Sequence, residues 1–203
     1  MDDDEHWTER LTHVPERVDS TAFWLRVALA SWLAAWGCLL IAMDHRTGAI
    51  GESFLHRPLL VFHEAGHVIL RPFGEWLMVA GGTLGQLAMP LVIAWVFLVR
   101  QHDPFGAAVA AWLLGVSVLD VAPYVYDALE PRLMLLGGRT GEDGGPHDWI
   151  FLLDSLGLRA RAPMLGGLCR FVGASLVLTA LAWMTGLLWR QYDRRAGDVL
   201  HED

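Results

Sequence analysis

The residues of this 203-residue chain with the clearest chemistry are two histidines and a glutamate within five positions, His63-Glu64-Ala65-Gly66-His67. In a helix, residues four positions apart share a face, so the two imidazoles can bind one zinc ion. Glu64 lies one step round the helix, where its carboxylate can reach a zinc-coordinated water. Zinc lowers the pKa of such a water to about 7, which makes it a nucleophile for a carbonyl carbon. The spacing predicts a zinc site with His63 and His67 as ligands and Glu64 as general base.

The surroundings of this motif favour a metal site over a chance match. The motif lies inside the apolar stretch 58–70, between Arg57 and Arg71. Polar side chains in an apolar segment are costly unless they are paired or bind a metal. The alternative is a structural network of hydrogen-bonded histidines.

The third zinc ligand is not set by the motif alone. A histidine at the sixth position after His67, preceded by glycine at the third, is excluded, because these positions hold Phe73 and Leu70. Glu75 is too close to fold back easily, and Glu130 is distant. Two candidates remain, His147 and Asp120.

His147 follows a glycine-rich segment, 137–145, that is flexible enough to carry it into a site and could also gate access to it. Imidazole is a standard zinc ligand, and the neighbouring Asp148 could support it. The alternative for His147 is a loop residue that caps the following helix.

Asp120 is an acid within an apolar run, which makes it a functional candidate. It shares one helix face with Tyr124 and Asp127. It could be a zinc ligand, a partner of a ligating histidine or a group that positions the substrate. The alternative is a polar contact between helices.

The elements that must position these residues are membrane helices. Hydrophobic residues make up 54% of the chain and charged residues 19%, with a mean hydropathy of +0.35. Four apolar runs, 22–43, 76–99, 105–128 and 171–189, come close to or exceed the ~20 residues that span a bilayer. We therefore expect an all-α fold, a polytopic helical bundle with about four transmembrane helices. The stretch 58–70 covers roughly 20 Å, so it is either a re-entrant helix or a fifth span.

The arginines favour one topology. If 58–70 does not cross, most of the arginines outside the long loops share one side with both termini, the cytoplasmic side. The loops 44–75 and 129–167 then lie together on the opposite side. We expect one domain over 1–203, with a polar arm at 1–20 and a polar tail at 190–203, in the inner membrane of a bacterium. The formal net charge of −8 argues against nucleic acid as a partner, and the oligomeric state is left open.

Two features of the second apolar run could support the site. Gly81 and Gly85 are four positions apart, which predicts a close approach between helix backbones. The alternative is a locally irregular backbone that pairs with an extended substrate. Gln86 follows, and we expect it to form an inter-helix hydrogen bond rather than to stabilise an oxyanion.

These residues resemble the site-2-protease-like intramembrane zinc metalloproteases, through Phe62-His63-Glu64-Ala65-Gly66-His67 in an apolar segment and Leu119-Asp120 in a later one. The resemblance implies that the two histidines and Asp120 bind zinc and that Glu64 activates water to cleave a peptide bond within the membrane. The chain departs from the family in having Val121 rather than glycine after Asp120. The element containing His147 is also foreign to the family pattern.

The function that these observations favour is a Zn²⁺-dependent, membrane-embedded peptidase acting on a membrane protein or peptide in the lipid bilayer. Its metal ligands are His63, His67 and His147, with Asp120 as the alternative third ligand, and Glu64 is the catalytic base. The alternative functions are a non-proteolytic membrane protein that binds or transports metal, and a structural membrane protein without metal.

Overall fold

The computed structural model describes residues 3–15 and 19–200, and within these ranges the chain is helical with no strand. The helices are α1 (Asp3–Thr12), α2 (Ser20–Ala42), η1 (Ala49–Glu52), α3 (His56–Leu70), η2 (Arg71–Phe73), α4 (Glu75–Trp95), the π-helical turn η3 (Val96–Arg100), α5 (Pro104–Asp127), α6 (Asp148–Ser155), η4 (Arg159–Arg161) and α7 (Ala162–Leu200).

Within the described part of the chain, four helical segments are long and apolar enough to cross a membrane: Ser20–Ala42, Glu75–Arg100, Pro104–Asp127 and Arg159–Arg194. The predicted all-α bundle with four such helices is therefore confirmed. Helix α5 is the central helix, because 67% of its most apolar stretch is buried, compared with 17% to 28% for the other three. The apolar side chains that those three expose suit a lipid surrounding.

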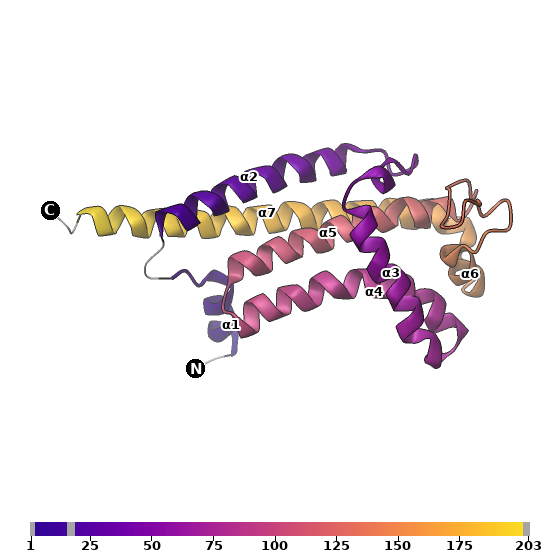
Figure 1. Cartoon of the computed structure of the whole chain (residues 1–203), viewed down its shortest axis with the longest axis horizontal. Helices are drawn as coiled ribbons and strands as arrows, with labels where there is room; N and C mark the ends of the chain where they lie inside the picture. The colour runs from indigo at the N-terminus through magenta and orange to yellow at the C-terminus, as the bar shows by residue number, and fades with distance from the viewer. Residues whose placement is uncertain (1–2, 16–18, 201–203) are drawn as a thin grey trace.

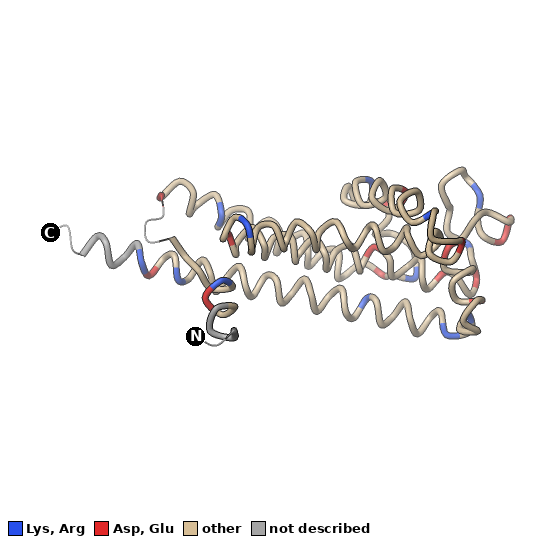
Figure 2. Tube along the Cα trace, turned by 90° about the horizontal axis from the view of Figure 1, so that it is seen from below, with Lys and Arg blue, Asp and Glu red and all other residues tan. Residues whose placement is uncertain are grey.

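The four long helices run along one axis in alternating directions (Figure 1). The connections from α2 to α4 and from α5 to α7 both lie at one end of the bundle, on the right of Figure 1. Helix α1, the turn between α4 and α5 and the end of α7 lie at the other end. Figure 2 shows that charged residues gather towards both ends and are sparse in the middle. The loops 44–75 and 129–167 therefore lie together, as expected from the arginine distribution.

Helix α3, which holds the histidine motif, lies against the first part of α4 at this loop end of the bundle and is inclined to the long axis of the bundle (Figure 1). It has 15 residues and is not among the helices long enough to span a membrane. Its outer face exposes Val61, Val68 and Ile69, whereas His63 and Gly66 are buried against the bundle. Of the two alternatives for this stretch, the structure agrees with the one in which it does not cross.

Three glycines allow α3 to lie directly on α4. A Cβ atom on Gly66 would overlap the carbonyl oxygen of Gly81, and a Cβ atom on Gly85 would lie 2.5 Å from the carbonyl oxygen of Phe62. Backbones approach this closely only where both helices lack side chains. The predicted close approach at Gly81 and Gly85 is confirmed, and these contacts fix the position of α3 along α4.

The polar ends of the chain are largely helical. In the predicted arm, the carbonyl groups of Leu11 and Thr12, at the end of α1, accept hydrogen bonds from Trp183 and Arg190 of α7. The predicted tail continues α7 as far as Leu200. Residues 1–2 and 16–18 of the arm and 201–203 of the tail lie outside the described residues.

Candidate metal centre

Three side chains that commonly bind metals converge at the loop end of the bundle. The ligand atoms of His63, His67 and Asp148 all lie within 4.8 Å of one another. Asp148 Oδ2 is 2.9 Å from His63 Nε2 and 3.3 Å from His67 Nε2. All three side chains are largely withdrawn from solvent, with exposed fractions of 9%, 22% and 15% in the same order. Two come from α3 and the third is the first residue of α6.

The outer nitrogens of the two imidazoles are held by acceptors. His67 Nδ1 lies 2.8 Å from the carbonyl oxygen of Met78, which can only accept, so Nδ1 carries the proton. His63 Nδ1 lies 3.3 Å from Gln86 Oε1. In the neutral form of each ring, the Nε2 lone pair then faces Asp148. Two lone pairs and a carboxylate at one point require a positive charge among them, supplied by protons or by a metal ion.

Gly82 of α4 forms the wall of this cluster. A Cβ atom at this position would collide with His63 Nε2 and would lie 2.6 Å from His67 Nε2. The space beside the two nitrogens therefore exists because residue 82 has no side chain. Two imidazole nitrogens and one carboxylate oxygen are also a donor set that zinc takes in proteins. The residues present thus fit a zinc ion in both space and chemistry.

Glu64, the predicted base, is exposed on α3 immediately after the first histidine. The centre of the Tyr124 ring, near the end of α5, lies 6.2 Å from that of His63. The Tyr124 hydroxyl accepts a hydrogen bond of 2.9 Å from the backbone N–H of Asp148. Tyr124 therefore fixes the start of α6 and with it the position of the Asp148 carboxylate.

His147 lies outside the cluster. Its Nδ1 accepts a hydrogen bond of 3.3 Å from the N–H of Ile150, which caps α6. Its Nε2 is 3.3 Å from Asp127 Oδ2, and its ring lies against that of Tyr124. Successive residues at a helix start project in different directions, so the turn that brings Asp148 to the histidines points His147 towards Asp127. The structure thus matches the capping alternative for His147 and does not bring it to the predicted ligand position.

Asp120, the other candidate, lies one side chain away from the cluster. Its Oδ2 accepts a hydrogen bond of 2.9 Å from Gln86 Nε2, and its Oδ1 is 2.9 Å from His56 Nδ1. The hydrogen bond to Asp120 raises the pKa of His56 and outweighs the opposing effect of burial. Asp120 is therefore neither within the cluster nor bonded directly to His63 or His67, and its contacts with α3 and α4 match the alternative of a polar contact between helices. The predicted inter-helix hydrogen bond of Gln86 is confirmed.

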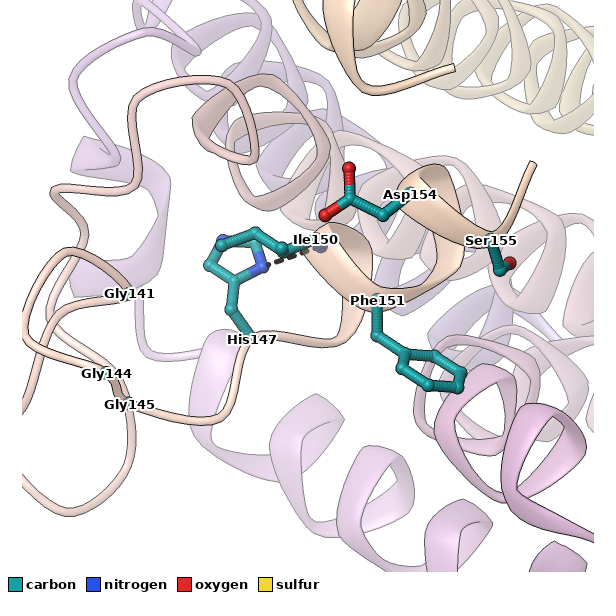
Figure 3. Close-up of a pocket in the computed structure, with 8 residues that line it drawn as sticks. All are labelled: Gly141, Gly144, Gly145, His147, Ile150, Phe151, Asp154 and Ser155. Atoms are coloured by element: carbon teal, nitrogen blue, oxygen red, sulfur yellow. Dashed lines mark hydrogen bonds between the residues drawn. The ribbon is translucent and has the colours of Figure 1, made fainter. Parts of the chain in front are cut away.

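A surface hollow of about 590 Å³ lies between the glycine-rich loop and α6 (Figure 3). Its lining comprises Gly141, Gly144, Gly145, His147, Ile150, Phe151, Asp154 and Ser155. The loop is folded rather than extended: Gly145 N–H donates to the carbonyl of Thr140. The hollow borders His147 but none of the three clustered residues, so it is a separate feature of the loop.

Three residues in or around the cluster could not be assigned their roles from the sequence. Asp148 is noted there only as a support for His147, Gly82 has no assigned role, and His56 is not singled out at all. The one signal for His56 is its position seven residues before His63, which places it on the same face of α3.

Comparisons with models of known protein families, with curated proteins and with solved structures each gave no match.

Proposed function

We propose that the chain is a zinc-dependent, membrane-embedded peptidase whose zinc ligands are His63, His67 and Asp148. The observation that carries the proposal is that the Nε2 atoms of His63 and His67, both on α3, lie close to the carboxylate of Asp148. The absence of a side chain at Gly82 leaves space beside these two atoms. The proposal retains the chemistry of the site-2-protease-like family. It replaces both sequence candidates for the third ligand, His147 and Asp120, by Asp148.

The residues divide the reaction between them. Zinc supplies a Lewis acid that activates water and polarises a carbonyl group. His63, His67 and Asp148 would hold the ion, and three protein ligands are the number that catalytic zinc sites commonly have. Glu64 accepts the proton of the attacking water and returns it to the leaving amine. Its exposure leaves the carboxylate free to meet a substrate that approaches α3 from outside the bundle.

The position of the site suggests the substrate class. The cluster lies at the loop end of the bundle, where water has access, and the adjoining face of α3 exposes Val61, Val68 and Ile69. A substrate that is itself apolar and extends from the bilayer suits both surroundings. We therefore propose a membrane protein or membrane peptide as substrate, in the inner membrane of a bacterium, with both termini of the enzyme in the cytoplasm.

The test uses the full chain in detergent with zinc, and a quenched fluorescent peptide consisting of an apolar helix with a glycine-proline break. The wild type should cleave it, and Glu64→Gln should bind zinc normally while losing cleavage by about 10²- to 10⁴-fold. Glu75→Gln is the matched control, because Glu75 is an exposed glutamate outside the cluster. Undiminished cleavage by Glu64→Gln would refute the proposal. Zinc binding without any cleavage by the wild type would favour a metal-binding or transport function instead.

A further inference from the structure

We propose that Gln86 and Asp120 are positioning residues that select the metal-binding form of His63, an inference that rests on the proposed zinc site. The three side chains form a hydrogen-bonded chain across α3, α4 and α5. His63 Nδ1 lies 3.3 Å from Gln86 Oε1, and Gln86 Nε2 donates to Asp120 Oδ2 at 2.9 Å. All three residues are at least nine-tenths buried.

The direction of this chain matters because a glutamine amide can present either end. An ionised carboxylate can only accept hydrogen bonds, so Asp120 holds the NH₂ group of Gln86 and turns its oxygen towards His63. His63 must then donate from Nδ1, which leaves the lone pair on Nε2, the atom that faces Asp148 and His67. If the amide were reversed, Nδ1 would have to accept. The ring proton would then sit on Nε2 and block the metal.

The two histidines differ in this respect. His67 Nδ1 donates to the backbone carbonyl of Met78, an acceptor that cannot be reversed. His63 instead depends on two side chains to achieve the same orientation. Substitutions at positions 86 and 120 should therefore disturb the orientation of His63 and leave that of His67 unchanged.

The outer end of the chain explains how a carboxylate is tolerated inside α5. Asp120 has a side-chain exposure of 6%, and its second oxygen accepts from His56 Nδ1 at 2.9 Å, with His56 itself one-third exposed. A buried carboxylate is costly unless its oxygens are all hydrogen-bonded. His56 and Gln86 together satisfy both oxygens, and these two contacts hold the carboxylate where it orients the amide.

A charge exchange between the two positions tests the inference. Asp120→Asn supplies an amide in place of the carboxylate and no longer dictates the orientation of Gln86, and Gln86→Leu removes the acceptor. The double variant Asp120→Asn with Gln86→Glu reverses the two groups: the new carboxylate accepts from His63 and from the new amide. The new amide oxygen still accepts from His56. Asp103→Asn, at the opposite end of the bundle, is the matched control.

The readouts are zinc affinity by competition with a chromogenic chelator and the visible absorption spectrum of the cobalt-substituted protein. Asp120→Asn and Gln86→Leu should each lower zinc affinity by about 10- to 100-fold, the usual effect of losing such a support, and should alter the cobalt spectrum. The double variant should recover most of the affinity and the wild-type spectrum. Unfolding of the zinc-free proteins separates these effects from a general loss of stability.

The inference is overturned if both single variants bind zinc as the wild type does, or if the double variant binds no better than Asp120→Asn. Because zinc affinity is measured without a substrate, these outcomes are distinct from a failure of the peptidase proposal, which would appear as zinc binding without cleavage. A wild type that binds no zinc would overturn both.

Discussion

Asp148 Oδ2 lies 2.9 Å from His63 Nε2, although the two residues are 85 positions apart in the chain. The contact joins the first residue of α6 to the middle of α3 and brings together two loops at the same end of the bundle (Figure 1). Tyr124 holds the backbone of Asp148, and Gly82 leaves space beside the histidine nitrogens. These residues make up the proposed zinc site, and substitution of each one tests its part in it.

Gly82→Ala should abolish or strongly weaken metal binding. The new Cβ atom would occupy the space beside His63 Nε2 and His67 Nε2 and force both rings to move. We expect zinc affinity to fall at least tenfold, since even supporting residues around a metal contribute that much. Chelator competition measures the change. Gly186→Ala is the control, because Gly186 is a helical glycine with open space around it. Equal zinc affinity in the two variants would contradict the assigned role of Gly82.

Gly66→Ala should destabilise the whole α3–α4 contact. A methyl group on Gly66 would overlap the backbone of Gly81, which cannot move without separating the two helices. Overpacking of this kind costs about 1–3 kcal/mol, and more where backbone atoms collide. Unfolding in mixed detergent micelles, followed by circular dichroism, gives the change. Gly167→Ala, on an open face of α7, should leave stability nearly unchanged. A Gly66→Ala protein as stable as this control would show that the close approach is not required.

His147→Ala should retain zinc but lose stability. The substitution removes the cap of α6 and the contact with Asp127, without touching the three clustered residues. Loss of a helix cap costs about 1 kcal/mol. Zinc content and the unfolding midpoint, measured on the same preparation, separate the two effects. Loss of zinc with unchanged stability would restore His147 as a ligand.

The contribution of His56 to stability should depend on pH. Its hydrogen bond to Asp120 raises the pKa of His56 above 6.5 in the folded protein, so the folded state binds this proton more tightly than the unfolded state. The resulting stabilisation is complete below pH 6.5 and is lost as the pH rises through the folded-state value. The loss of stability caused by His56→Gln should therefore be larger at about pH 5.5 than at about pH 9. Unfolding of both zinc-free proteins at the two pH values measures it, and a loss that grows with pH would contradict the assignment.

Most of the fold could be predicted from the sequence, because each long helix corresponds to one continuous apolar run. The four apolar runs match α2, α4, α5 and α7 to within a few residues at most ends, and the stretch 58–70 matches α3. The packing of α3 against the first part of α4 was not predicted. It depends on the contact of Gly66 with Gly81 and Gly85, and glycine spacing within one helix indicates a close approach but not its partner or its angle.

Only part of the candidate metal site could be predicted from the sequence. Two residues four apart on one helix carry their geometry in the sequence, which is why His63 and His67 are found together. The third member of the cluster depends on how a loop and α6 pack on α3. Choosing between the neighbours His147 and Asp148 requires the direction of each side chain at the helix start. The preference of zinc for imidazole ligands favoured His147 over Asp148. In the structure, however, the His147 ring is held by the N–H of Ile150 and by Asp127, away from the two histidines.

The central claim is that His63, His67 and Asp148 bind one zinc ion, and zinc content per chain tests it most directly. The full-length protein is purified in detergent, incubated with zinc, freed of excess ion and measured by elemental analysis, beside His63→Ala, His67→Ala, Asp148→Ala and His147→Ala. We predict about one zinc per chain in the wild type and in His147→Ala, and a loss of bound zinc in the other three. A wild type without zinc, or an Asp148→Ala protein that retains a full complement, would contradict the account.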